Sequence, residues 1–170
     1  MTWIAPQVTR SEESFVADER GMLEGILERH RETLLWKCSG LSGEQLALEA
    51  VPASSLSLLG IVRHMAETER AWFRGRFRGE RLPRVYGDRP DAAFDEADPS
   101  GAEEAFLRLT GEWDLSREAV AGASLDDQFT HERGMRMSLR WVFNHMIVEY
   151  ARHNGHADLL RESIDGMTGE

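Results

Sequence analysis

The sequence contains a single cysteine, a single lysine and no long hydrophobic run. With Cys38 alone, no disulfide can form within the chain, which favours a reducing compartment. No apolar stretch approaches the roughly 20 residues that a membrane-spanning helix needs. Residues 1–6 lack the charged and apolar regions of a secretion signal. We therefore expect a cytoplasmic protein that does not bind membranes.

Positive charge is also scarce. The chain has 20 Lys and Arg residues against 30 Asp and Glu residues, a formal net charge of -10. An acidic surface repels nucleic-acid phosphates, so we expect no nucleic-acid partner. A length of 170 residues with 41% hydrophobic content suits one folded domain, residues 1–170, rather than a disordered chain.

Hydrophobic periodicity predicts four long helices and little strand. Apolar residues recur at spacings of three and four in each predicted helix, which is the signature of one buried face. A fold of this kind is an all-α helical bundle. The four predicted helices cover residues 11–39, 55–78, 100–122 and 138–164.

Capping and turn residues indicate where these helices begin and end. Ser55 or Ser57 is the expected N-cap of the second helix, and Ser100 with Glu103 matches a capping box at the start of the third. We expect a single helical turn near residues 41–46 and a short hairpin between residues 129 and 137. Residues 79–98 form a linker of unusual length, which indicates a functional flap or a segment packed onto the helices.

Histidines concentrate on the second and fourth predicted helices. His145, Glu149 and His153 recur every four residues, so they share one stripe of the fourth helix, and His156 lies near it. His64 sits amid the apolar face of the second helix. Imidazoles and a carboxylate can hold Zn²⁺, Ni²⁺ or Fe²⁺ with one coordination position left open. The spacing alone is equally compatible with a buried structural histidine and a solvated ladder of charges.

The same segments resemble a known family. Residues 55–67 are similar to the second helix of the DinB-like metalloprotein superfamily, and residues 138–158 are similar to its fourth helix. Residues 160–166 resemble an actinobacterial branch of that superfamily. The resemblance extends over about residues 10–168. It implies a four-helix bundle with up-down-down-up order, a divalent metal site and a homodimer.

The resemblance also implies a ligand set. The position on the second helix maps to His64, and the pair on the fourth helix maps to Glu149 and His153. This His-Glu-His set resembles that of the relatives of mycothiol-dependent maleylpyruvate isomerase. A rival set consists of His64, His145 and Glu149. The expected metal is Zn²⁺, with Ni²⁺, Fe²⁺ and Mn²⁺ as alternatives.

Characterised relatives conjugate small thiols to electrophiles or isomerise substrates with a thiol cofactor. The resemblance thus implies a metal-dependent thiol S-transferase or isomerase that acts on small molecules, related to bacillithiol and mycothiol S-transferases. Two alternatives are a metal-dependent hydrolase and a non-catalytic metal-binding protein.

Other residues are candidates for accessory roles near the expected metal site. His145 and His156 are candidates for general acid–base catalysis or for orienting a ligand. Arg152 either forms an ion pair on the helix or binds an anionic substrate or cofactor. Cys38 is not needed as a nucleophile, and we expect His30 and His131 to be exposed to solvent.

Overall fold

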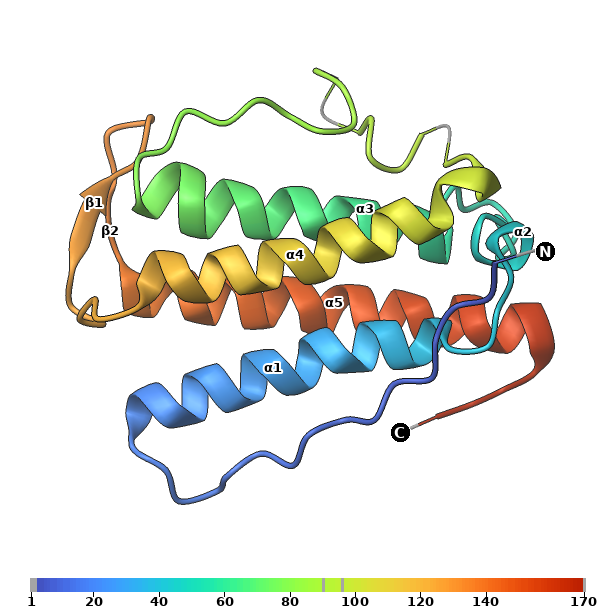
Figure 1. Ribbon diagram of the computed structural model, residues 1–170, viewed down its shortest axis with the longest axis horizontal. Helices are drawn as coiled ribbons and strands as arrows, with labels where there is room; N and C mark the ends of the chain where they lie inside the picture. The colour runs from blue at the N-terminus through green and yellow to red at the C-terminus, as the bar shows by residue number, and fades with distance from the viewer. Residues whose placement is uncertain (1–2, 90, 96, 170) are drawn as a thin grey trace.

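The computed structural model describes residues 3–89, 91–95 and 97–169, which form a mostly helical protein with one small antiparallel sheet. Four long helices lie lengthwise beside one another (Figure 1). None of the helices in the described part of the chain is long and apolar enough to cross a membrane. The elements in chain order are α1 (Glu19–Cys38), α2 (Gly43–Leu46), α3 (Leu58–Glu69), the π-helix η1 (Arg70–Phe77), the 3-10 turn η2 (Pro99–Gly101), α4 (Ala102–Val120), β1 (Gln128–Thr130), β2 (Arg136–Ser138) and α5 (Leu139–Asp165).

The long helices run in two directions. In Figure 1, α3 and α4 both run from right to left, whereas α1 and α5 run from left to right. Because α3 and α4 are parallel neighbours, the chain between them must return along their whole length. The described residues of this return segment, 79–89, 91–95 and 97–98, lie over the upper side of α3 (Figure 1). The long linker is thus a consequence of the helix order.

Local capping chemistry sets several helix ends. The hydroxyl of Ser57 accepts a hydrogen bond from the Gly60 N–H at 3.0 Å, and the hydroxyl of Ser138 accepts one from the Trp141 N–H at 3.2 Å. Each serine satisfies an N–H group that has no partner in the first helical turn. Gly166 ends α5 with a φ of 76°, a left-handed conformation that glycine adopts without strain. The predicted start and end of the last helix are confirmed.

Two predictions at helix starts are wrong. Residues 11–18 are not helical, because the chain runs back along the outside of α1, where Ser11 donates from its hydroxyl to Glu32 at 2.6 Å. Phe15, which lies within the predicted first helix, is 86% exposed instead of packed on a helix face. The capping box at Ser100 is also absent, because Asp98 accepts the Ser100 N–H and opens the turn η2 instead. The N-cap of α4 is Gly101, without a side-chain hydrogen bond.

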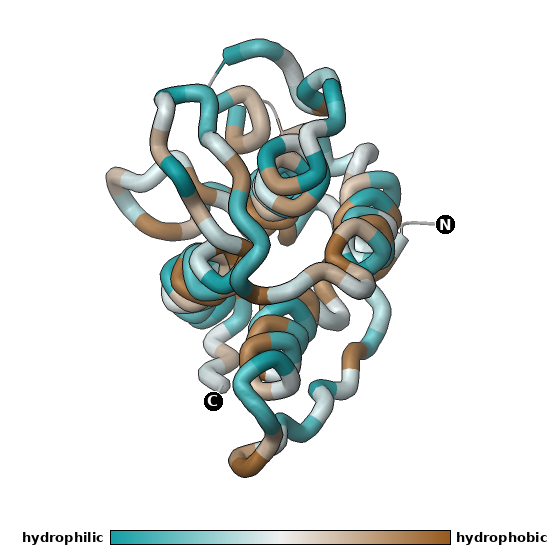
Figure 2. The backbone as a smooth tube through the Cα atoms, turned by 90° about the vertical axis from the view of Figure 1, so that its left-hand side faces the viewer, coloured by the Kyte–Doolittle hydropathy of each residue, from teal (hydrophilic) through white to brown (hydrophobic). Residues whose placement is uncertain are grey.

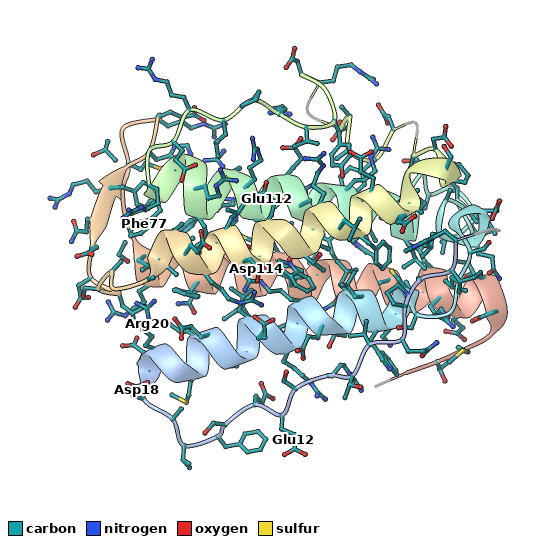
Figure 3. The ribbon with its side chains drawn as sticks, in the orientation of Figure 1. Glu12, Asp18, Arg20, Phe77, Glu112 and Asp114 are labelled. Carbon is teal, nitrogen blue, oxygen red and sulfur yellow. The ribbon has the colours of Figure 1, made fainter. Side chains whose placement is uncertain are left out.

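The predicted hairpin is confirmed, with β1 and β2 paired around residues 131–135. It closes one end of the helices, where Phe77 packs edge-on against Phe129 at 6.0 Å between ring centroids (Figure 3). His131 follows β1 and is only 8% exposed, so the expectation of an exposed His131 is wrong. His30 is half-buried against Asn154 of α5, whose side-chain amide donates to the His30 carbonyl at 3.0 Å.

The hydrophobic core lies between the long helices. Seen end-on, the helices carry both hydrophobic and hydrophilic residues around their circumference (Figure 2). α1 packs mainly against α5, and α3 packs mainly against α4. Fully buried core residues from all four helices include Leu27, Leu34, Leu58, Ile61, Val62, Met65, Leu109, Leu139, Val142 and Met146.

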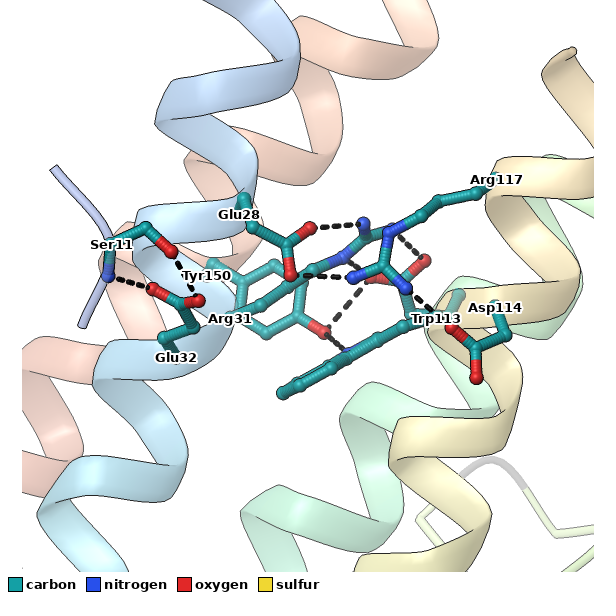
Figure 4. A network of polar contacts seen from close by, with 9 residues as sticks. Ser11, Glu28, Arg31, Glu32, Trp113, Asp114, Arg117 and Tyr150 are labelled. Carbon is teal, nitrogen blue, oxygen red and sulfur yellow. Dashed lines mark hydrogen bonds and ion pairs between the residues drawn. The ribbon is translucent and has the colours of Figure 1, made fainter. Parts of the chain in front are cut away.

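A buried polar network crosses this core (Figure 4). Arg31 of α1 donates two hydrogen bonds, of 2.8 and 2.7 Å, to the carboxylate of Glu69 on α3. The Tyr150 hydroxyl of α5 donates to Glu69 at 2.9 Å and accepts from the Trp113 indole N–H of α4 at 2.8 Å. Burial, followed by the Glu69 charge, raises the pKa of Tyr150, which keeps this hydroxyl a donor. One side chain from each long helix is therefore held in place.

A second buried carboxylate joins α4 to the π-helix. Glu112, where α4 passes α3 and η1, accepts from Arg70 at 2.9 Å and from Arg74 at 3.0 Å (Figure 3). Arg74 also donates to Glu80 at 2.9 Å. These pairs connect the π-helix to α4 and to the start of the return segment. Since π-helical turns are rare and costly, such contacts help to retain η1.

The buried network predicts a large difference between two chemically identical substitutions. Glu69→Gln removes the charge that compensates the buried Arg31, and we expect it to lower the free energy of unfolding by about 3 kcal/mol or more. Glu24→Gln changes an exposed glutamate that pairs with Arg20 on the same helix, and we expect less than about 0.5 kcal/mol. Urea unfolding monitored by circular dichroism measures both. Equal effects would contradict a central role for the Glu69 network.

Candidate metal centre

Three side chains of the right chemistry for a metal converge between α3 and α5. One ligand atom from each of His64, Glu149 and His153 lies within 4.8 Å of the other two. The Nε2 atom of His153 is 3.7 Å from Oε2 of Glu149, and the imidazole centroids of His64 and His153 are 4.7 Å apart. His153 is buried, and the other two are partly buried. The structure thus brings together the three residues that the resemblance implied.

Helix geometry explains this convergence. Glu149 and His153 are four residues apart on α5, so their side chains lie one above the other on the same face. His64 lies on α3, which packs against α5. The neighbours Glu69 and Tyr150 are joined by the buried hydrogen bond of 2.9 Å. That bond fixes the rotation of α3 against α5 close to the three candidate ligands.

The donor set fits a divalent metal ion. Tetrahedral zinc with bonds of about 2.1 Å to nitrogen and oxygen places its ligand atoms about 3.4 Å apart. The separation of 3.7 Å between Nε2 of His153 and Oε2 of Glu149 is close to this value. The ligand atom of His64 lies within 4.8 Å of the other two, a distance that small side-chain rotations can shorten to about 3.4 Å. Two imidazoles and one carboxylate leave a fourth position open, as in catalytic rather than structural zinc sites.

Electrostatics keep both imidazoles in the form that binds metals. Burial, followed by the charge of Arg152, lowers the pKa of His64 to about 4. Burial, followed by the neighbouring His64, lowers the pKa of His153 to about 4 as well. Both rings are therefore neutral at neutral pH, with a lone pair available for coordination.

The return segment forms one wall of the site. The Phe94 ring stacks on the His64 imidazole with centroids 4.6 Å apart. The Glu67 carboxylate anchors the segment to α3 by accepting the backbone N–H groups of Val85 at 2.5 Å and Tyr86 at 3.0 Å. Of the two interpretations of residues 79–98, packing onto the helices is the one observed, and the packed segment borders the candidate site.

Two of the predicted accessory residues are close to the cluster. Nδ1 of His156 lies 3.5 Å from Nδ1 of His153, on the side of the ring away from Glu149. Arg152 is largely exposed, with its guanidinium 3.4 Å from the Glu149 carboxylate. Both residues therefore border the cluster without belonging to it.

His145 occupies a different environment. Its ring stacks on Trp141 at 4.8 Å and contacts Trp72 of the π-helix at 4.4 Å. Burial is the main reason that its pKa is lowered. The group of potential ligands in the described part of the chain contains His153 and not His145. The geometry therefore favours the set implied by the resemblance over the rival set of His64, His145 and Glu149.

Sequence reasoning missed several residues around the site. Thr68, one turn after His64, places its hydroxyl 3.4 Å from the His64 Nε2 atom. Phe94 and Arg76 come from a linker and a π-helix, for which periodicity carries no signal. A threonine at i+4 from a candidate ligand could have indicated Thr68, because this spacing shares a helix face. Cys38 is buried, which raises its pKa to about 12 and leaves it an unreactive thiol.

The mostly helical fold and the cluster of two histidines and a glutamate are compatible with the class of DinB-like proteins, and the comparison of the sequence with family models shows that class. The family model described as mycothiol-S-transferase matches residues 22–166. The chain belongs to the mycothiol S-transferase family. No curated protein and no solved structure matches the chain.

The cluster predicts a metal stoichiometry that depends on three side chains. Protein purified without a nickel column is expected to carry about one divalent ion per chain. Glu149→Gln and His153→Ala should each lose most of this metal, whereas His145→Ala should retain it. Elemental analysis of the dialysed proteins measures the content. Loss of metal in His145→Ala together with retention in His153→Ala would restore the rival set.

The lowered pKa values predict an acid-sensitive metal-free protein. Between about pH 6.5 and 4 the unfolded chain binds protons at His64 and His153 that the folded chain does not, so stability must decrease as the pH falls through this window. Each pKa unit corresponds to about 1.4 kcal/mol. Urea unfolding in a chelator at several pH values tests this. The decrease should be smaller in His64→Asn, and an identical decrease would contradict the assignment.

Proposed function

We propose that the protein is a metal-dependent thiol S-transferase that joins a small thiol of the mycothiol type to an electrophile. The observation that carries the proposal is the His64, Glu149 and His153 cluster in a chain that belongs to the mycothiol S-transferase family. Three protein donors leave a coordination position for a sulfur atom. The open side of the cluster borders a cavity lined by His64 and the π-helix, where a substrate has access.

The chemistry of such a site is the activation of a thiol. A divalent ion held there would lower the pKa of a bound thiol and so present a thiolate at neutral pH. His64, Glu149 and His153 would hold the ion. Arg152, at 3.4 Å from Glu149, would limit the rotation of that carboxylate. In the overall reaction the thiol loses its proton and its sulfur forms a bond to the electrophilic carbon. In a substitution, the leaving group departs with the electron pair of the bond that breaks and the proton is released to a base. In an addition, the π-electron pair moves to the neighbouring atom, which takes up the proton.

The chain supplies groups for positioning and proton transfer. With Nε2 of His153 directed to the metal, its Nδ1–H would donate to Nδ1 of His156, which lies 3.5 Å away. That contact would fix both the tautomer and the orientation of His153. His145, in contact with both Trp72 and Trp141, is one turn of α5 from Glu149 and is the candidate base for the thiol proton. Cys38 takes no part, since its thiol is buried.

We also propose that the chain is a single domain with the up-down-down-up order of a four-helix bundle. α3 and α4 run parallel to each other, and α1 and α5 both run in the opposite direction, which supports this order (Figure 1). The homodimer and the cytoplasmic location expected from the sequence stay predictions. Size-exclusion chromatography with light scattering measures the oligomeric state directly.

The proposed reaction predicts thiol consumption that requires the metal site. With zinc-loaded protein, mycothiol and a reactive test electrophile such as monochlorobimane, we expect conjugate formation well above the uncatalysed rate. Glu149→Gln should reduce this rate to background, and His156→Gln should reduce it by about 10- to 100-fold through the orientation of His153. Liquid chromatography with mass spectrometry quantifies the conjugate.

A matched control is available in Cys38→Ala, which removes the chain's own thiol and should leave the rate unchanged. Full activity after removal of the metal by a chelator would contradict the proposal. So would release of hydrolysed substrate in place of a thiol conjugate, which would indicate the hydrolase alternative.

A further inference from the structure

A cavity of about 540 Å³ opens beside His64, between α3, the π-helix and the return segment. This volume suits a small molecule. Thr68 and Trp72 line the cavity on the helical side, and Leu82 and Pro83 line it on the side of the return segment. Because His64 belongs both to the cavity wall and to the candidate metal cluster, a molecule in the cavity lies next to the metal site.

Two arginines of this wall, Arg76 and Arg84, lie within ion-pair distance of no carboxylate in the described part of the chain, although the charge of Glu132 acts on Arg76 from further away. Arg76 is partly buried, donates from Nε to the His131 ring at 3.1 Å and lies over the Trp72 ring at 4.4 Å. Arg84 donates only to the carbonyl of Arg89, at 3.1 Å. Both arginines line the cavity. Neither arginine is in an ion pair; Arg84 is exposed to solvent at the mouth of the cavity, whereas Arg76 is partly buried in its wall.

The other two arginines of the cavity wall and two of its three glutamates already have polar partners. Arg70 pairs with Glu112 at 2.9 Å, and Arg89 pairs with Asp95 at 2.8 Å. Among the acidic groups, Glu67 accepts two backbone N–H groups of the return segment, and Glu80 pairs with Arg74 at 2.9 Å. Glu132 is the remaining acid of the wall and lies 4.0 Å from the His131 ring.

The positive charge of Arg76 is unfavourable when no anion is bound beside it. Burial lowers its pKa, and although Glu132 acts in the opposite direction, Arg84 and Arg133 lower the pKa further. A guanidinium that is partly removed from water and repelled by two like charges is stabilised by a bound anion. Carboxylate and phosphate groups match the fork of a guanidinium best. The chain as a whole has a net charge of -10, so its overall composition does not explain why positive side chains gather on this wall.

We propose that this cavity binds the anionic group of the electrophile, so that the acceptor substrate is a small carboxylate or phosphate compound. The proposal rests on the S-transferase function above. Arg76 and Arg84 bind the anion, and the reactive carbon points toward His64 and the metal. For an α,β-unsaturated acid, the thiolate sulfur forms a bond to the β-carbon, the π-electron pair moves to the α-carbon, and this carbon takes up the proton that the thiol released.

A binding experiment tests the cavity without any turnover. Zinc-loaded protein is titrated with succinate and with inorganic phosphate by isothermal calorimetry, which separates carboxylate from phosphate recognition. We expect at least one of them to bind, and Arg84→Gln to weaken that binding by about 10-fold or more. Arg81→Gln is the matched control, because this exposed arginine of the same segment does not line the cavity, and it should bind as the wild type does.

Several outcomes would overturn the proposal. These are failure of both anions to bind, and equal binding by wild type and Arg84→Gln, which would place the anion on the metal instead. Because calorimetry requires no reaction, a protein that binds the anion through Arg84 and conjugates no thiol would refute the S-transferase function and leave the anion site in place.

A kinetic comparison then assigns the anion to the electrophile rather than to the thiol. Fumarate and its dimethyl ester are used as acceptors with the same thiol, and kcat/KM is measured for each. Arg84→Gln should lower the ratio of acid to ester by about 10-fold, whereas Arg81→Gln should not change it. An equal loss with both acceptors would contradict the assignment, because it would place the anion on the thiol or reflect a general disturbance of the fold.

Discussion

The buried hydrogen-bonded pair of Arg31 and Glu69, extended by Tyr150 and Trp113, is the constraint on which the rest of the structure depends. An uncompensated charge in the core is costly, so each long helix must present its partner to this network at one rotation and one height. Hydrophobic packing alone tolerates small shifts of one helix along another. The hydrogen-bonded network does not tolerate such shifts. It therefore determines which residues of α3 and α5 face each other next to Glu69 and Tyr150.

The candidate metal centre and its cavity follow from that arrangement. With α3 and α5 in register, His64 meets Glu149 and His153, and burial keeps the two imidazoles neutral. With α3 and α4 parallel, residues 79–98 must travel back over α3. The same segment thus brings Phe94 onto His64 and Arg84 into the wall of the cavity. A segment that the helix order requires thus also lines the candidate site.

Much of the secondary structure could be predicted from the sequence because its signals are local. Ser57 and Ser138 cap their helices through their own hydroxyls, and Gly166 ends α5 through its backbone freedom. Predictions failed where a competing contact was not local. The N-terminal segment leaves the helix because Ser11 bonds to Glu32, which is 21 residues away, and His131 is buried because the hairpin folds toward Arg76. The π-helix has no periodicity signal of its own, so η1 was merged with α3.

The sequence by itself determined that Glu149 and His153 share one face of a helix, since a spacing of four residues and a pitch of 3.6 residues per turn leave no other arrangement. It also placed His64 on an apolar face. Only the tertiary structure decided that these two faces meet, that His145 contacts two tryptophans, and that Arg76 and Arg84 line the cavity beside His64. The physical reason is that helical periodicity depends on neighbours in the chain, whereas the pairing of faces and charges depends on contacts between residues as far as 124 positions apart.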